Sequence, residues 1–239
     1  MEVYYKVDER INGYLVRKII GEGRYGIAYL VTNDQNERYV LKQLKKEMIQ
    51  DTKDNLFYEE KTLRHLDYPN FPKFISKYED KYGEGYILEY IDGVVFEDLL
   101  VEEQYTFSRD EIYKVGSQLL DLVEILQNHN IVHRDIRLPN VILKENKEIA
   151  LIDFGLARFI DNDRYYKEED YSGIGDFLLF LYYSSYEETN SEERPWFEEL
   201  DLNIEEVKFL KKLMGIEEGY KDIKEIKKQL NKVIEYDNK

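Results

Sequence analysis

Three glycines near the N-terminus have the spacing of a phosphate-binding loop. The segment Gly21-Glu22-Gly23-Arg24-Tyr25-Gly26 fits the pattern GxGxxG. Glycines let the backbone approach a ligand closely, and its N–H groups can then donate hydrogen bonds to phosphate oxygens. The pattern alone is weak evidence, because an ordinary glycine-containing hairpin would have the same sequence.

The residues after the glycines separate two kinds of phosphate-binding loop. The same spacing occurs in dinucleotide-binding folds, where a helix must follow the third glycine, and in protein kinases, where a strand follows it. Here the residues from Ile27 to Thr32 are apolar and β-branched, and a second strand-like run comes after them. The sequence therefore favours a strand, a glycine turn and another strand.

A lysine and a glutamate further along could complete a phosphate site. Lys42 ends the third strand-like run, although a lysine on a strand is by itself usually only solvated. In a protein kinase, the lysine at this place contacts the phosphates of ATP and needs a glutamate on a helix to hold its ammonium group. The helix expected over about residues 53–66 offers Glu59 and Glu60. Glu59 shares the apolar face with Leu63, whereas Glu60 is rotated about 100° toward solvent, so we predict that Glu59 points inward.

The most informative segment is an octapeptide in the second half of the chain, followed by a tripeptide. The octapeptide His133-Arg134-Asp135-Ile136-Arg137-Leu138-Pro139-Asn140 resembles the H-R-D-L-x-x-x-N catalytic loop of protein kinases, with Ile in place of Leu. Asp153-Phe154-Gly155 begins thirteen residues after Asn140, as the magnesium-binding DFG motif of the same enzymes does. Because these motifs occur in order, the sequence is similar to the protein kinase superfamily, and specifically to the small bacterial Hanks-type serine/threonine kinases. The resemblance covers roughly Gly13 to Leu230.

The resemblance implies a role for each matching residue. Asp135 would be the catalytic base, and Arg137, where many such kinases have lysine, would clamp the transferring phosphate. Lys42 and Glu59 would form an ion pair. Asn140 and Asp153 would hold Mg²⁺. ATP would be bound by the glycine loop, the adenine-contacting positions, the gatekeeper and the hinge, which correspond to Gly21, Glu22, Gly23, Gly26, Ala28, Val40, Lys42, Leu88, Glu89, Ile91 and Ile142.

The elements that must position these residues follow from hydrophobic periodicity. Up to about Ile91, most short segments are rich in Val, Ile, Tyr and Phe with turn residues between them, which suits strands. Beyond Asp92 the pattern turns helical, and a long helix is opened by Ser108 and Glu111 at capping-box spacing. Three further helical stretches are expected near residues 171–183, 204–214 and 223–234.

These patterns and the resemblance together predict the fold class and the domain organisation. We expect an α+β, bilobal protein kinase-like fold that forms one kinase domain over residues 1–239. The N-lobe, an antiparallel β-sheet with one helix, would span about residues 1–91. The mostly α-helical C-lobe would span about residues 92–239.

Composition limits the compartment and the partners of this chain. The 239 residues carry 34 Lys and Arg against 50 Asp and Glu, a formal net charge of −16. A surface this acidic repels phosphate backbones and anionic lipids, so we expect no nucleic-acid and no membrane partner. The N-terminus lacks the basic start and apolar run of a signal peptide, and we expect a cytoplasmic protein. The resemblance implies ATP, Mg²⁺ and an unidentified protein substrate, and it indicates no oligomeric state.

The segment after Asp153 is shorter than in the family. Family members usually begin the next helix with Asp-x-Trp-Ser-x-Gly, and the run from Asp170 to Gly175 fits that position only seventeen residues after Asp153. No Ala-Pro-Glu occurs between them, so the substrate-docking loop is missing or severely shortened. Full-size kinases often use the Arg before the catalytic Asp to grip a phosphorylated residue of this segment. We therefore expect Arg134 to be neutralised by a fixed local partner, a carboxylate or backbone carbonyls, without phosphorylation.

Two other functions stay open at the level of sequence. A small-molecule phosphotransferase of the aminoglycoside or choline kinase type would share the fold, but those enzymes usually show His-Gly-Asp where this chain has His-Arg-Asp. A nucleotide-binding pseudokinase acting as a scaffold would explain the short segment. Against a pseudokinase, the chain keeps the full set of matching residues, namely Lys42, Glu59, Asp135, Asn140 and Asp153. A serine/threonine protein kinase is therefore the favoured function.

Overall fold

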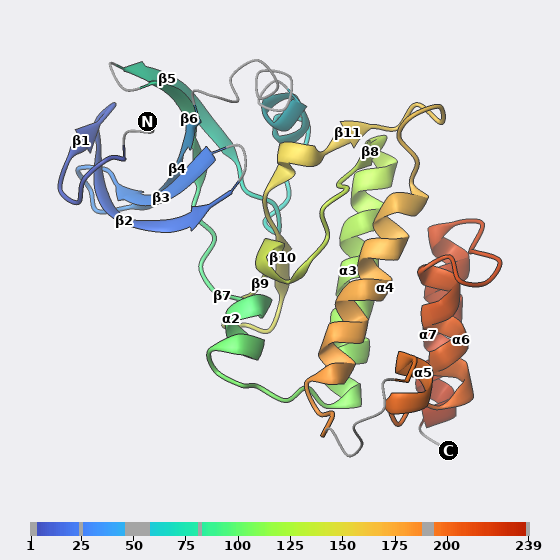
Figure 1. The fold of residues 1–239 in the computed structure, drawn as a ribbon. Helices are drawn as coiled ribbons and strands as arrows, with labels where there is room; N and C mark the ends of the chain where they lie inside the picture. The colour runs from blue at the N-terminus through green and yellow to red at the C-terminus, as the bar shows by residue number, and fades with distance from the viewer. Residues whose placement is uncertain (1–3, 24–25, 46–57, 81–82, 188–193, 238–239) are drawn as a thin grey trace. The chain divides into compact units, whose positions relative to one another are not determined.

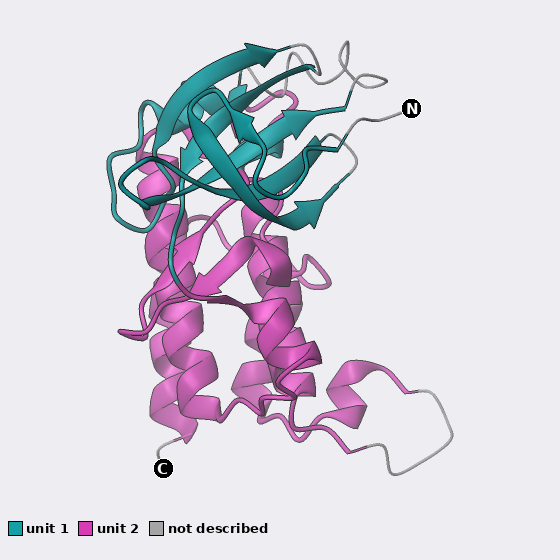
Figure 2. Ribbon diagram, turned by 90° about the vertical axis from the view of Figure 1, so that its left-hand side faces the viewer, with its two compact units in different colours: residues 1–92, 154–156 teal, residues 93–153, 157–239 magenta. Residues whose placement is uncertain are grey.

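The computed structural model of this chain divides into two compact units. The first unit contains residues 1–92 and 154–156, and the second contains residues 93–153 and 157–239 (Figure 2). The structure describes residues 4–23, 26–45, 58–80, 83–187 and 194–237. The division separates the strand-rich half of the sequence from the helical half.

The first unit is built on a curled antiparallel sheet (Figure 1). Its strands are β1 (Arg10–Ile11), β2 (Tyr14–Glu22), β3 (Gly26–Thr32), β4 (Arg38–Leu44), β5 (Phe74–Asp80) and β6 (Gly83–Glu89), hydrogen-bonded in the order β1-β2-β3-β4-β6-β5. Residues 58–63, between β4 and β5, are helical. The first part of the helix predicted over residues 53–66, up to residue 57, lies outside the described residues. The helix ends at residue 63, where i to i+3 hydrogen bonds such as that from Leu66 N–H to Leu63 O tighten the last turn.

Alternation along the strands gives this sheet two different faces. One face is apolar and buried, and its core consists of Tyr5, Ile11, Val16, Ile27, Tyr29, Val31, Leu41, Tyr78 and Ile87. Side chains one position out of step point to the other face, because successive residues of a strand alternate. The register pairs Ala28 with Lys42, and Val40 with Leu88, so these four side chains share that second face. The sheet thus brings four of the predicted ATP-binding residues to one surface.

The second unit is mostly helical (Figure 1). Its helices are α2 (Phe96–Val101), α3 (Arg109–Asn128), α4 (Glu168–Tyr183), α5 (Trp196–Glu199), α6 (Ile204–Leu213) and α7 (Ile223–Asp237). Both α3 and α6 pack against α4 and α7. The capping box predicted for the long helix is confirmed, because the Ser108 hydroxyl accepts the N–H of Glu111 and the Glu111 carboxylate accepts the N–H of Ser108.

Short strands lie among these helices. β7 (Val94–Val95), β9 (Val141–Leu143) and β10 (Ile149–Leu151) form a three-stranded sheet, and β8 (Ile131–Val132) pairs with β11 (Arg158–Phe159). The antiparallel hairpin of β9 and β10 carries the chain from Asn140 to Asp153. The predicted α+β class, a sheet with a helix followed by a mostly helical half, is confirmed.

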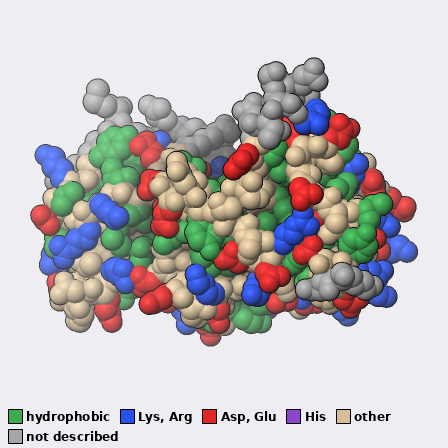
Figure 3. Space-filling view, turned by 90° about the horizontal axis from the view of Figure 1, so that it is seen from below, with side chains coloured by type: hydrophobic (Ala, Val, Ile, Leu, Met, Phe, Trp, Pro, Cys, Tyr) green, Lys and Arg blue, Asp and Glu red, His purple; other side chains and the backbone are tan. Residues whose placement is uncertain are grey.

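The surface carries charges of both signs. On the face drawn in Figure 3, Lys and Arg side chains are interspersed with Asp and Glu side chains. In the part of the chain that the structure describes, no helix is both long and apolar enough to cross a membrane.

Candidate active site

Lys42 and Glu59 form an ion pair in the first unit. Lys42 lies on β4, and its Nζ is 2.9 Å from Oε1 of Glu59, in the helix that precedes β5. The Glu59 side chain is 1% exposed and that of Lys42 is 19% exposed, so water and salt screen this pair less than a surface pair. Glu60 pairs instead with Arg64 and Lys77. The structure thus places Glu59, and not its neighbour, beside the lysine.

Tyr86 contacts both residues of this ion pair, and sequence reasoning missed it. It lies on β6, where the sheet register places it directly opposite Lys42. Its hydroxyl donates a hydrogen bond to Oε2 of Glu59, and Nζ of Lys42 lies 5.7 Å from the centre of its ring. No motif marks this tyrosine. The signal that could have found it is its two-residue spacing from Leu88, which places both side chains on one face of the strand.

The glycine loop joins β2 to β3 in the same sheet. Gly21 and Glu22 end β2, and the N–H of Gly23 donates to the carbonyl of Gly26 at 2.9 Å. A Cβ atom on Gly26 would lie 2.6 Å from the carbonyl oxygen of Gln43, so this close approach requires glycine. The two residues between Gly23 and Gly26 lie outside the described part of the chain.

The residues predicted to contact adenine and the hinge occur in both units. Those of the first unit lie on the sheet or just after it, and they are Ala28, Val40, Leu88, Glu89 and Ile91. Ile142 belongs to the second unit, where it is 7% exposed on β9. Their contacts with a nucleotide stay predictions.

In the second unit, the Asp135 carboxylate is held at both of its oxygens. Oδ1 is 3.0 Å from Nε of Arg137, and Oδ2 accepts a hydrogen bond of 2.7 Å from Nδ2 of Asn140. The same Nδ2 donates to the backbone carbonyl of Asp135 at 2.9 Å. Asn140 is 4% exposed and lies in a 3-10 turn that contains Pro139 and precedes β9. One loop therefore brings the predicted base and the predicted metal-binding amide together.

Asp170, in the first turn of α4, holds the backbone of this loop. It is 1% exposed, and its two oxygens accept the N–H of His133 at 2.9 Å and the N–H of Arg134 at 2.8 Å. Burial raises the pKa of Asp170 to about 7, while hydrogen bonds from the two N–H groups favour the ionised form. Arg134 has a φ of 70°, which residues other than glycine adopt rarely, and these two bonds stabilise that conformation. Asp170 thus fixes the backbone just before Asp135.

Asp153 follows β10, at the other end of the hairpin that begins after Asn140. The N–H of Ile152 donates to the carbonyl of Asn140 at 2.9 Å. The residue directly before Asp153 is therefore hydrogen-bonded to the last residue of the loop. A carboxylate and an amide oxygen are hard donors of the kind that Mg²⁺ prefers. Within the described residues, no group of three or more His, Cys, Asp or Glu side chains could hold a metal. The two-residue set still fits Mg²⁺, which usually binds one or two protein carboxylates together with substrate phosphates.

Comparison with known proteins decides the family. The family model for the protein kinase domain matches residues 14–173. The chain belongs to the protein kinase family. It is 34% identical over 230 residues to the probable serine/threonine-protein kinase YbdM of Bacillus subtilis, a match that covers 93% of this chain and 90% of that protein. It is 29% identical to calcium-dependent protein kinase 9 of Arabidopsis thaliana and 31% identical to probable serine/threonine-protein kinase 2 of Plasmodium falciparum, over 65% and 63% of this chain and 30% of each relative.

The family and the type of enzyme predicted from the sequence are confirmed by these matches. The relative from Bacillus subtilis aligns over nearly its whole length, as expected if this chain is a small bacterial member of the family. The three relatives are all named as protein kinases, and none is named as a small-molecule kinase.

The first turn of α4, directly after the short segment, supplies this kinase with a fixed partner for Arg134. Nε of Arg134 is 2.8 Å from Oε2 of Glu169, and its guanidinium lies over the ring of Tyr165, 4.8 Å from the ring centre. Arg158 and Arg164 contact the same ring, at 5.9 and 5.7 Å. The expectation of a local neutralising partner is confirmed, and that partner is the carboxylate of Glu169.

Because Glu169 already pairs with Arg134, activity should need no phosphorylation of the short segment. Replacing Tyr165 and Tyr166 together with Phe should leave phosphoryl transfer within about twofold of the parent, since Phe keeps the ring that contacts the guanidinium. Glu169→Gln should lower transfer, because it removes the charge that Arg134 faces. Loss of most activity in the double Phe variant, or a phosphotyrosine found by mass spectrometry in the only active fraction, would show that the segment is a switch.

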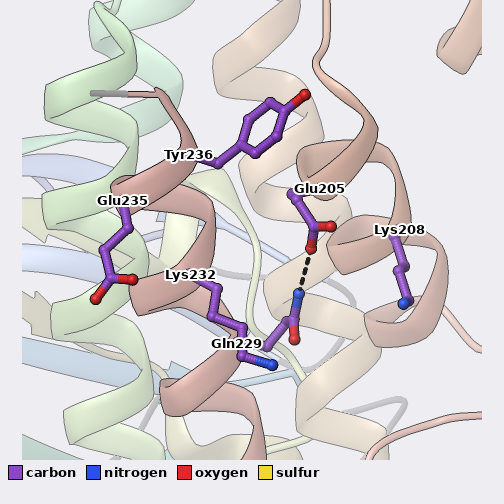
Figure 4. A pocket seen from close by; sticks show the side chains of 6 residues that line it. All are labelled: Glu205, Lys208, Gln229, Lys232, Glu235 and Tyr236. Carbon is purple, nitrogen blue, oxygen red and sulfur yellow. Dashed lines mark hydrogen bonds between the residues drawn. The ribbon is translucent and has the colours of Figure 1, made fainter. Parts of the chain in front are cut away.

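A separate pocket lies between α6 and α7. It has a volume of about 280 Å³ and is lined by Glu205, Lys208, Gln229, Lys232, Glu235 and Tyr236 (Figure 4). Nε2 of Gln229 donates to Glu205 across it at 2.8 Å. None of the predicted site residues lines this pocket, so it is distinct from the candidate active site.

Proposed function

We propose that this kinase transfers the γ-phosphate of ATP, as the magnesium complex, to a serine or threonine hydroxyl of a protein substrate. The observation that carries the proposal is the Asp135 carboxylate, held by Asn140 in a chain that also keeps the Lys42–Glu59 ion pair. Phosphoryl transfer by protein kinases needs both the loop carboxylate and the lysine–glutamate pair. The serine/threonine class follows the names of the relatives from Bacillus subtilis and Plasmodium falciparum.

The catalytic loop would move one proton and stabilise the transferring phosphate. The substrate hydroxyl oxygen attacks the γ-phosphorus, the bond from that phosphorus to the bridging oxygen breaks, and ADP leaves. The hydroxyl proton passes to the Asp135 carboxylate and from there to solvent. The Arg137 side chain is 63% exposed and pairs with Oδ1 of Asp135. Its movement to the transferring phosphate would free that oxygen for the proton.

The first unit would orient the triphosphate. Lys42 would donate to the α- and β-phosphates while Glu59 fixes the direction of its ammonium group. The backbone N–H groups of the glycine loop would cover the phosphates. The apolar positions that the resemblance assigns to adenine are Ala28, Val40, Leu88 and Ile142, and it assigns the hinge to Glu89 through Ile91.

Asn140 and Asp153 would hold Mg²⁺, which when bound neutralises charge on the β- and γ-phosphates. The amide nitrogen of Asn140 is directed at Asp135, so its amide oxygen is the atom for the metal. Asp153 would supply a carboxylate oxygen.

We further propose that the two units act together as one cytoplasmic kinase domain with no nucleic-acid or membrane partner. Neither unit holds the whole set of predicted residues, since Lys42 and Glu59 belong to the first and Asp135 belongs to the second. The net charge of −16 supports the choice of partners, because it disfavours phosphate backbones and anionic lipids.

Incubation of the purified kinase with γ-labelled MgATP, with and without cell extract, tests this function. Label on serine or threonine of the kinase itself or of an extract protein would support it, and phosphoamino-acid analysis would separate these residues from tyrosine. Label on a small molecule would indicate a small-molecule kinase. Retained nucleotide binding with no transfer would indicate a pseudokinase. Asp135→Asn is the control, because it should bind nucleotide and transfer phosphate far more slowly than the parent.

A further inference from the structure

The buried carboxylate of Glu59 has a different partner at each oxygen. Oε1 accepts from Nζ of Lys42 at 2.9 Å, and Oε2 accepts from the hydroxyl of Tyr86. Glu59 is 1% exposed, and a buried carboxylate is tolerated only when it is paired and hydrogen-bonded. The Tyr86 hydroxyl therefore contributes to holding Glu59 in its inward position.

Tyr86 is itself held firmly in the sheet. It is 4% exposed and lies directly opposite Lys42 in the register of β4 and β6. Its ring stacks on that of Phe74, with the ring centres 5.9 Å apart and the planes at 21°. Arg64 directly follows the helix that carries Glu59. Its guanidinium lies over the Phe74 ring, 4.8 Å from the ring centre. The hydroxyl thus approaches Glu59 from a strand whose neighbours restrict its movement.

The two partners of Glu59 differ in what else they must do. In the proposed function, the Lys42 ammonium has three donors to share between Glu59 and the phosphates of ATP. The Tyr86 hydroxyl binds the other oxygen of Glu59, so its hydrogen bond does not compete with the Lys42 bond. The glutamate therefore keeps one partner on the sheet even while the lysine engages the nucleotide.

We propose that Tyr86 is a positioning residue whose hydroxyl holds Glu59 toward Lys42, so that the ion pair is formed without a signal from the activation segment. The inference rests on the proposed function. In many kinases, phosphorylation of the activation segment controls the placement of the helix glutamate. Here that segment is short, and Arg134 already pairs with Glu169 in the first turn of α4. The sheet supplies the contact that places Glu59.

Tyr86→Phe tests this role, because it removes the hydroxyl and keeps the ring that stacks on Phe74. We expect kcat to fall about tenfold, as for the loss of one hydrogen bond to a charged group, while KM for ATP changes less than about threefold. The matched control is Tyr78→Phe, which removes another buried tyrosine hydroxyl of the same sheet, one that bonds to Tyr5. This control should keep kcat within about twofold of the parent.

A double-mutant cycle with Glu59→Ala separates positioning from a general loss of structure. If Tyr86 acts through Glu59, Tyr86→Phe lowers the kcat and the unfolding midpoint of the parent but changes neither much in the Glu59→Ala background. Additive effects in both readouts, or a kcat for Tyr86→Phe within about twofold of the parent, would overturn the role of Tyr86. The unfolding readout needs no phosphoryl transfer. Absence of transfer in the parent would therefore overturn the proposed function, and the cycle would still decide whether Tyr86 acts on Glu59.

Discussion

Asp135→Asn is expected to lower phosphoryl transfer by about 10²- to 10⁴-fold, which is the usual contribution of a general base. An amide cannot take the hydroxyl proton as a carboxylate does, and it offers Arg137 no negative charge. MgATP binding should stay nearly unchanged, because Asp135 is assigned to the acceptor hydroxyl and not to the nucleotide. Measuring kcat by transfer of labelled phosphate and Kd by calorimetry would separate the two effects.

The companion change Asp153→Asn should also cause a severe loss of transfer, but for a different reason. It removes a carboxylate from the predicted magnesium set, so half-maximal nucleotide binding should require more Mg²⁺ than in the parent. Asp163→Asn, at an exposed aspartate of the short segment, is the matched control and should keep the parental rate. Transfer at the parental rate in either active-site variant would contradict the roles assigned to Asp135 and Asp153.

The contacts within the loop from His133 to Asn140 could be predicted from the sequence because its residues are close along the chain. Asp135 and Asn140 are five residues apart, and the turn that contains Pro139 brings them into hydrogen-bonding distance. Glu59 could be preferred to Glu60 from the helical period, because Glu59 shares a helix face with Leu63. Both side chains are buried in the structure. Short-range geometry of this kind does not depend on how distant strands pair.

Other contacts depend on pairings that the sequence does not show. Tyr86 meets Glu59 because β4 and β6 pair with Lys42 opposite Tyr86, and a shift of one residue would send the hydroxyl to the other face. A fixed local partner for Arg134, a carboxylate or backbone carbonyls, was expected. Which residue takes this role depends on where α4 begins. That helix begins at Glu168 and not near residue 171, since acidic residues in a first turn are favoured by the helix dipole. The two-residue strands β1, β7, β8 and β11 are too short for an alternating pattern to appear.

Lys42→Met should lower kcat by about 10²- to 10³-fold, as expected for the loss of one fixed donor to the reacting phosphates. The affinity for ATP should fall less than about tenfold, because the apolar positions predicted to contact adenine on the same sheet face remain. Glu59→Gln should act in the same direction but more weakly, since Lys42 stays and loses only the charge that orients it. Transfer kinetics and calorimetric Kd, measured on the same preparations, would show whether the loss lies in kcat as expected.

Glu60→Gln is the matched control for this ion pair. Glu60 follows Glu59 on the same helix, but its carboxylate pairs with Arg64 and Lys77. Loss of the charge from a partly exposed ion pair has only a small effect on stability, so kcat should stay within about twofold of the parent. A large loss in Glu60→Gln together with a silent Glu59→Gln would mean that the wrong glutamate had been assigned to the lysine. Both substitutions remove one negative charge from adjacent positions of one helix, so a difference between them isolates the contact with Lys42 from the change in charge.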